Sequence, residues 1–328
     1  MLPNKSDDPI PVLRETAVDP KPITELKPTG PKRKKKSDYQ NVTGYLFISP
    51  FLLGFFLLTL YPILYSLYLS FTDYDLMSEP NWIGLDNYVR MFTGDETFWQ
   101  SFKVTLMYAG VAVPFRLIFA LLVALALNKV VEMAGLYRTL LYLPSVVGGS
   151  IAVSIMWRQL FGNDGAFNSI LALLGIPTHS WLGDPKTAIW TLIVLYGWQF
   201  GSSMLIFLAG LRNIPKTYYE ASSVDGASPI KQFFIITLPL LTPVILFNMI
   251  MQIIQGFMAF TPSFVVTNGG PVNSTLLYVL YMYRRAFEYF DMGYASAMAW
   301  FMLIIIAVLT GLIFKTSKHW VHYESDNK

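Results

Sequence analysis

The chain has 328 residues, of which 54% are hydrophobic and 14% are charged, and its mean hydropathy is +0.45. This composition is too apolar for an ordinary soluble domain and indicates an integral membrane protein. The formal net charge is +3 and the chain has no cysteine, which excludes disulfides, thiolate metal sites and cysteine nucleophiles.

The first 40 residues are rich in proline and lysine and contain no apolar run. They cannot bury enough surface to fold, so we expect residues 1–40 to form a disordered basic arm in the cytoplasm. Four lysines and one arginine occupy positions 32–36, directly before the first apolar stretch. There they would set membrane orientation and contact lipid, so we expect lipid and not nucleic acid as a partner. That apolar stretch is too long for a cleavable signal peptide.

Six segments are long and apolar enough for membrane helices, each of which needs about 20 residues. They are residues 43–71, 103–129, 138–160, 187–211, 233–260 and 294–315. The sequence therefore predicts an all-α integral membrane protein with six transmembrane helices in a domain of residues 41–318. Lys and Arg are more frequent on the side of the arm, and many of them lie in the arm itself. This bias places both termini, including a tail of residues 319–328, in the cytoplasm.

Three loops would then lie outside the cytoplasm. Residues 72–102 are acidic and aromatic, and we interpret them as a solvated docking surface. Residues 161–186 include a stretch, 166–174, that suits a short interfacial helix. The third loop contains Thr267-Asn268-Gly269-Gly270-Pro271, a turn-rich stretch.

The cytoplasmic loop between the fourth and fifth segments, residues 212–232, has its own helix signals. Pro215 suits a first helical turn, residues 217–223 contain no helix breaker, and Gly226 suits a left-handed end. Ser228 before Pro229 suits the start of a second helix. We predict a helix–turn–helix on the cytoplasmic face, where a plain connecting loop is the alternative.

The motifs of this loop resemble the EAA loop of ABC-importer permeases, through which ATPase subunits drive the membrane subunits. They are Glu220-Ala221-Ser222, Asp225-Gly226-Ala227 and Ile236-x-Leu238-Pro239, and Ser222 departs from the family pattern, where alanine is usual. Residues 43–315 also resemble the maltose- and glycerol-phosphate-importer membrane subunits. The matching stretches include Ser49-Pro50-Phe51, Trp82-Ile83-Gly84-Leu85-Asp86-Asn87-Tyr88 and Gly293-Tyr294-Ala295-Ser296-Ala297.

The resemblance implies a binding-protein-dependent ABC importer permease of the carbohydrate branch, with a five-helix core. Such a subunit would move an oligosaccharide or related sugar across the bacterial inner membrane by alternating access. Implied partners are a second homologous permease, two ATPase subunits and a periplasmic or extracellular solute-binding protein. The sequence lacks G-x-x-x-x-G-K-[ST], so we expect ATP and Mg²⁺ on the ATPase subunits and no cofactor on this chain. ATPase coupling is assigned to Glu220, Ala221, Ser222, Asp225, Gly226 and Ala227.

Polar residues inside membrane segments are costly unless they face protein or water. In the fifth segment Asn248, Gln252 and Gln255 share one helical stripe, beside Gly256. Amides and aromatic faces suit sugar hydroxyls and sugar C–H faces, and helix–helix hydrogen bonds are the alternative. The predicted substrate pathway comprises Asn248, Gln252, Gln255 and Gly256, with Trp198, Gln199 and Ser202 from the fourth segment.

Arg116 is the charged residue well inside a predicted segment, where burial costs about 2.5–3.5 kcal/mol. We favour a structural role, paired with a backbone carbonyl or with the partner permease. Attraction of an anionic solute, such as an acidic oligosaccharide, stays open.

Two other function classes are disfavoured. An ion-coupled secondary sugar transporter would need acidic or histidine residues inside the membrane, and the predicted segments contain no Asp or Glu. A membrane enzyme would need a nucleophile–base or carboxylate constellation at one interface, and the acidic residues of 72–102 fit a docking surface better. We therefore expect a transporter subunit without catalytic residues. We expect His319 and His322 to be solvated next to the membrane and not to bind a metal.

Overall fold

The computed structural model describes residues 38–129 and 134–322. The chain divides into two units, Met1–Leu58 and Thr59–Lys328, which are described separately. In the first unit, α1 spans Asp38–Gly54 and leads into the π-helical stretch η1, Phe55–Leu60. Almost all of the predicted arm, and the tail beyond residue 322, lie outside the described residues.

The second unit is helical throughout, apart from turns and one isolated bridge between Thr72 and Trp82 in the described part of the chain. Its α-helices are α2 (Tyr61–Leu69), α3 (Asp86–Thr93), α4 (Glu96–Lys129), α5 (Ala134–Val147), α6 (Ile151–Leu160), α7 (Ala166–Leu173), α8 (Ala188–Trp198), α9 (Gly201–Asn213), α10 (Lys216–Val224), α11 (Pro229–Gln232), α12 (Leu238–Phe257), α13 (Tyr278–Tyr283) and α14 (Met292–Ser317). Three π-helical stretches join them: η2 (Phe233–Thr237), η3 (Ser263–Thr267) and η4 (Arg284–Glu288).

Four helical stretches in the described residues are long and apolar enough to cross a membrane: Gly44–Leu69, Glu96–Lys129, Pro229–Phe257 and Met292–Ser317. Two bent pairs, α5 with α6 and α8 with α9, raise the number to six if each pair is one span. The predicted all-α membrane fold is therefore confirmed. Two of the six predicted segments, 138–160 and 187–211, are bent pairs, in which α5 and α6 meet at 95° and α8 and α9 at 43°.

The break between α5 and α6 follows from Gly148-Gly149-Ser150. The side chain of Ser150 accepts a hydrogen bond from the backbone N–H of Val153 at 3.3 Å, so α6 begins with a new N-cap. The freed carbonyl of Gly148 accepts a hydrogen bond from Nε2 of Gln199 at 3.0 Å. A Cβ at Gly148 would lie 2.3 Å from the Gln199 side chain, so glycine lets the two segments meet.

The break between α8 and α9 lies against this first break. The hydroxyl of Ser145 donates to the carbonyl of Gln199 at 2.8 Å and accepts from the backbone N–H of Ser202 at 3.0 Å. A Cβ at Gly201 would lie 2.7 Å from the carbonyl oxygen of Leu141. Each interrupted helix thus satisfies backbone groups freed in the other, which is how breaks are tolerated at membrane depth.

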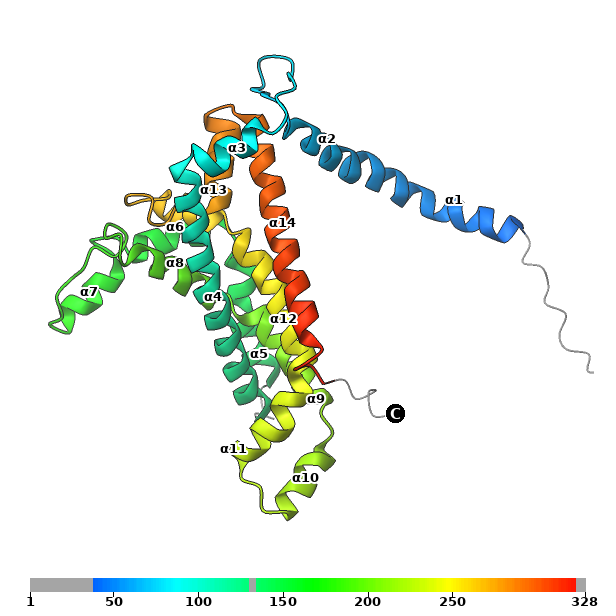
Figure 1. Ribbon diagram of the computed structural model, residues 1–328. Helices are drawn as coiled ribbons and strands as arrows, with labels where there is room; N and C mark the ends of the chain where they lie inside the picture. Colours follow the sequence, from blue (N-terminus) through cyan, green and yellow to red (C-terminus); the bar gives the residue numbers. More distant parts are fainter. Residues whose placement is uncertain (1–37, 130–133, 323–328) are drawn as a thin grey trace, which may run out of the picture. The chain divides into compact units, whose positions relative to one another are not determined.

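Helix α4 lies at the centre of the second unit and packs against α8, α9 and α12. Small residues make this possible, since Ala112, Ala120 and Ala124 are completely buried. A Cβ at Gly256 of α12 would lie 3.1 Å from the side chain of Val113, so glycine lets α12 approach α4 closely. Figure 1 shows α3 and α13 at one end of this bundle and α10 and α11 at the other. We call these the loop end (residues 70–95 and 268–292) and the hairpin end (residues 214–232).

Candidate functional site

The hairpin end is built by local backbone signals. Pro215 precedes α10 in an extended conformation, and α10 ends at Val224, two residues before Gly226, whose φ is +74°. The N–H groups of Gly226 and Ala227 donate to the carbonyls of Ser223 and Ser222 at 3.1 and 2.9 Å. Nothing lies within 4 Å of a Cβ built on Gly226, so the backbone conformation and not crowding requires glycine.

The return helix begins where the sequence predicts. The hydroxyl of Ser228 accepts from the N–H of Lys231 at 3.4 Å, and α11 continues through η2 into α12 without a gap. The predicted helix–turn–helix is therefore confirmed as a structure. Its chain runs directly into the long apolar stretch Pro229–Phe257.

Tyr219 and Gln232 hold the two arms of the hairpin together. The hydroxyls of Tyr219 and Thr237 are 2.9 Å apart, and Nε2 of Gln232 donates to the hydroxyl of Ser223 at 2.9 Å. Helix α10 is thus tied to α11 as well as to the base of α12. Sequence reasoning missed Tyr219 and Gln232, because no local signal distinguishes them from ordinary helix residues.

The predicted coupling residues lie on the accessible side of this hairpin. Glu220, Ala221, Asp225 and Gly226 are exposed, while Ser222 and Ala227 are half-buried. The hydroxyl of Ser222 donates to the carbonyl of Tyr219 at 3.0 Å, so serine in place of alanine leaves no unpaired hydroxyl. Val224 at the tip is 89% exposed. The hairpin therefore presents acidic and apolar side chains together.

The polar stripe of α12 divides between the interior and the surface of the bundle. Asn248 and Gln252 are buried, and Tyr196 of α8 donates its hydroxyl to Oε1 of Gln252 at 2.9 Å. Nδ2 of Asn248 donates to the carbonyl of Ser203 at 3.4 Å. These contacts are the helix–helix hydrogen bonds of the alternative interpretation. Gln255 is exposed, and Trp198 is 37% exposed at the end of α8.

Arg116 is buried within the bundle at 4% exposure. Its guanidinium carbon lies 4.6 Å from the centre of the Tyr196 ring, and one terminal nitrogen donates to the hydroxyl of Ser202 at 3.2 Å. Within the described residues the contacts of Arg116 are therefore with Tyr196 and Ser202, and its pairing with a partner permease stays a prediction. The ring of Tyr108 completes this buried cluster, with its centroid 5.9 Å from that of Tyr196.

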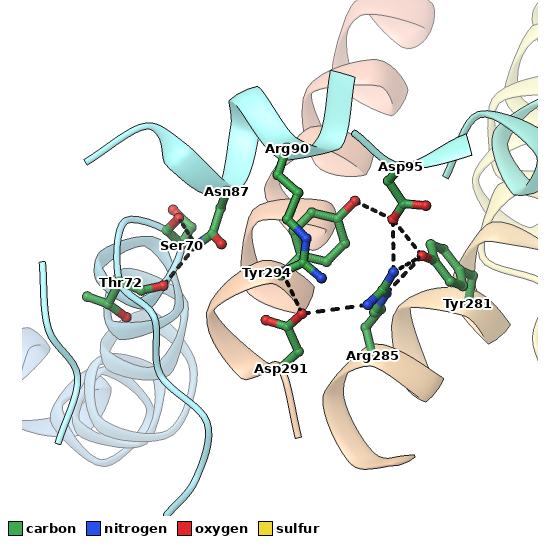
Figure 2. A network of polar contacts seen from close by, with 9 residues as sticks. All are labelled: Ser70, Thr72, Asn87, Arg90, Asp95, Tyr281, Arg285, Asp291 and Tyr294. Carbon is green, nitrogen blue, oxygen red and sulfur yellow. Dashed lines mark hydrogen bonds and ion pairs between the residues drawn. The ribbon is translucent and has the colours of Figure 1, made fainter. Parts of the chain in front are cut away.

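A second polar network lies at the loop end (Figure 2). One carboxylate oxygen of Asp95 accepts from the hydroxyls of Tyr281 and Tyr294, at 2.5 and 2.7 Å, and from Arg285 at 3.2 Å. The other oxygen accepts from the N–H of Phe98 in the first turn of α4 at 3.0 Å. Burial raises the pKa of Asp95, but these hydrogen bonds and the charge of Arg285 outweigh it and hold the pKa below its usual value.

The network extends to the loop between α2 and α3. Arg90 pairs with Asp291 at 2.9 Å, and the side-chain amide of Asn87 donates to the carbonyls of Ser70 and Thr72 at 3.0 and 2.8 Å (Figure 2). A Cβ at Gly293 would lie 2.1 Å from the carbonyl oxygen of Thr72, which explains the glycine that opens α14. Asp95 is buried and α4 begins at Glu96, so the predicted solvated surface of 72–102 is wrong for Asp95 and for the end of the loop, and docking at this surface stays a prediction.

Residues 91–321 match the family described as the binding-protein-dependent transport system inner membrane component. The chain belongs to this family. It is therefore a multi-pass transport permease of the inner membrane, and its curated relatives are named as transport permeases rather than enzymes. The predicted family is confirmed.

Three curated relatives cover most of the chain. It is 57% identical to a probable ABC transporter permease protein, YesP, of Bacillus subtilis (strain 168), over 90% of this chain and 96% of the relative. It is 35% identical to the arabinooligosaccharides transport system permease protein AraP of the same organism, over 83% of this chain and 88% of the relative. The lactose transport system permease protein LacF of Rhizobium radiobacter is also 35% identical, over 87% of this chain and 97% of the relative.

The fold is also found in a solved structure. A crystal structure of a bacterial ABC transporter involved in the import of the acidic polysaccharide alginate contains a chain that superposes with a TM-score of 0.75 at 22% identity. The superposition covers 85% of this chain and 96% of that chain. At this identity the match establishes the ABC-importer permease fold.

Proposed function

We propose that this chain is the permease subunit of an ATP-driven importer that moves an oligosaccharide or related sugar across the bacterial inner membrane. The observation that carries the proposal is the hairpin of residues 214–232, an exposed polar helix–turn–helix on a binding-protein-dependent transport permease. Relatives named for arabinooligosaccharides and lactose support a sugar as the solute. A second homologous permease, two ATPase subunits and a solute-binding protein complete the proposed complex.

The hairpin would lie in the cytoplasm, with both termini on the same side. ATP and Mg²⁺ bind the ATPase subunits, which grip α10 around Glu220, Asp225 and the apolar tip at Val224. Closure of the ATPase dimer displaces α10, and the contact between Tyr219 and Thr237 passes this displacement to the base of α12. The bundle then changes between inward- and outward-facing states, whose relative populations are set by what binds each state.

Within the bundle, the accessible residues Gln255 and Trp198 are the proposed contacts for the moving sugar. Asn248 and Gln252 would support that surface from behind, through their hydrogen bonds to α9 and α8. Gln199 and Ser202 would hold the breaks in α5–α6 and α8–α9 in place. Gly256 would set the distance between α12 and α4.

Attraction of an anionic solute by Arg116 is not favoured. The guanidinium is covered by the Tyr196 ring and bonded to Ser202, so in this conformation it does not face an open space. Arg116 is better assigned to packing between α4, α8 and α9.

The proposal is tested by transport with the whole complex in proteoliposomes. Glu220→Lys and Gly226→Pro should allow ATP hydrolysis without sugar uptake. Glu220→Lys reverses a charge on the face of α10 that is proposed to contact the ATPase, and Gly226→Pro breaks the turn after α10. Ser222→Ala, which restores the residue usual in the family, is the control and should transport normally. Unchanged uptake in both coupling variants would contradict the proposal.

A further inference from the structure

A cavity of about 590 Å³ lies between α6, the start of α7 and the end of α8. This volume falls in the range of small-molecule sites, about 300–1,000 Å³. The lining includes Trp157 and Trp198, together with the amide of Gln159 and the carboxylate of Asp164. All four of these side chains are outside the polar stripe of α12 and outside the coupling hairpin, and only Trp198 belongs to the predicted substrate pathway.

The two indole rings form one wall of the cavity. Their centroids are 6.0 Å apart and their planes meet at 37°. Trp157 is fixed because its Nε1 donates to the carbonyl of Thr191 at 3.0 Å, whereas Trp198 keeps 37% of its surface exposed. The negative face of an aromatic ring attracts weakly positive C–H hydrogens, such as those on one face of a sugar ring.

The polar side chains of the cavity determine which ligands can bind against the two indole rings. Gln159 and Asp164 are both exposed, so their polar atoms are free to meet a ligand. An amide both donates and accepts, whereas an ionised carboxylate only accepts, and so Asp164 requires donors such as hydroxyl groups. The negative charge also disfavours an anionic group at this position.

The far wall of the cavity is held in place by Asn168, which is 3% exposed. Its amide nitrogen donates to the carbonyls of Asn163 and His179 at 3.0 and 2.9 Å, and its oxygen accepts from Nε1 of Trp181 at 2.9 Å. The loop that carries Asp164 is thus tied to the loop before α8. A site shaped before the ligand arrives loses less conformational freedom on binding.

We propose that this cavity is a saccharide subsite that holds one neutral sugar unit against Trp157 and Trp198, with Gln159 and Asp164 on its hydroxyls. The inference rests on the proposed function and extends it to residues that the helical stripe of α12 does not contain. Trp198 directly precedes Gln199 at the break between α8 and α9, so the subsite adjoins the segment assigned to the pathway.

The test is saturation-transfer NMR on the assembled transporter in lipid nanodiscs, with lactose, arabinotriose and trigalacturonate as probes. Saturation should reach the C–H protons of the two neutral probes more strongly than those of trigalacturonate. Trp198→Ala should reduce the saturation transfer to the neutral probes about fivefold, since it removes one aromatic face. Asp164→Asn should reduce the difference in saturation transfer between the neutral probes and trigalacturonate, since it removes the negative charge. Leu173→Ala, on the 86% exposed outer side of α7, is the matched control.

Equal transfer in the wild type, Trp198→Ala and Asp164→Asn would overturn the subsite and would assign the cavity to lipid. ATP-dependent uptake, measured in parallel, separates this result from a failure of the proposed function. If uptake persists while the saturation transfer is equal in all three proteins, the proposed importer function stands and only the proposed subsite is rejected. A complex that hydrolyses ATP but imports none of the three probes would overturn the sugar assignment and the subsite with it.

Discussion

The hydroxyl of Tyr219 on α10 lies 2.9 Å from the hydroxyl of Thr237, one residue before α12 begins. This contact joins α10 directly to the base of the helix that carries Asn248, Gln252 and Gln255. A movement of α10 reaches α12 only if the two helices are joined by more than the turn between them. The contact between Tyr219 and Thr237 supplies this second connection, in addition to the turn at Gly226.

Tyr219→Phe should therefore weaken coupling more than it weakens folding. Loss of one hydrogen bond costs about 1 kcal/mol of stability, so the variant should still insert and assemble. We expect the number of sugar molecules imported per ATP hydrolysed to fall several-fold, and reconstituted vesicles give both rates. Thr237→Val, which removes the other hydroxyl, should have the same effect. A transport ratio equal to the wild type in both variants would show that the contact transmits nothing.

Two substitutions of Gly226 should reduce sugar uptake to different extents. Asparagine tolerates a positive φ and should keep most of the uptake, whereas valine should lose most of it, because a β-branched residue is strained at +74°. Space does not explain such a difference, since nothing lies within 4 Å of the added Cβ. Uptake is the measurement, and equal uptake by the two variants would contradict the assignment of this glycine to backbone conformation.

Helix propensity and capping explain why the hairpin could be predicted from the sequence. Pro215, Gly226 and Ser228 each act on their immediate neighbours, so a single sequence is enough to locate them. Gln199 could not be understood in the same way. Its amide fills the break after Gly148, and the contact depends on two interrupted helices meeting in space.

Asp95 is the clearest failure of local reasoning. It lies in a stretch rich in acidic and aromatic residues, which indicates a solvated loop. Its hydrogen-bond partners Tyr281, Arg285 and Tyr294 lie almost 200 residues further along the chain. Composition within a short window carries no information about them.

Asp95→Asn should destabilise the loop end by about 3 kcal/mol, because it leaves Arg285 without its buried partner. Tyr281→Phe removes one hydrogen bond and should cost about 1 kcal/mol. Thermal unfolding of the purified permease at neutral pH gives both values. If the two variants unfold at the same temperature, the charge of Asp95 does not contribute as described.

The same carboxylate predicts a dependence of stability on pH. The pKa of Asp95 is lower in the folded protein than its usual value, so its ionised form contributes stability at neutral pH. That contribution is lost as the pH falls through the folded-state pKa, below the unfolded value of about 3.9. The difference in unfolding temperature between the wild type and Asp95→Asn should therefore shrink on acidification. A difference that stays constant from neutral pH to pH 3 would argue against an ionised Asp95.

Arg116→Met tests whether the buried guanidinium packs or attracts solute. Methionine fills a similar apolar volume, and Nε of Arg116 has no hydrogen-bond partner to lose. We expect uptake of neutral and anionic oligosaccharides to change in the same proportion, by less than about threefold, since a buried charge is often replaceable by apolar packing. Selective loss of uptake for an anionic probe such as trigalacturonate would instead assign Arg116 to the solute.

The central claim is that residues 214–232 face the cytoplasm and are gripped there by an ATPase. The natural chain has no cysteine, so single cysteines report their side of the membrane without background. Val224→Cys at the hairpin tip and Val272→Cys at the loop end are matched probes, being 89% and 83% exposed. A membrane-impermeant maleimide should label the first in inside-out vesicles and the second in right-side-out vesicles, and bound ATPase should protect the first. Labelling of Val224→Cys from outside the cell, or equal labelling with and without the ATPase, would contradict the account.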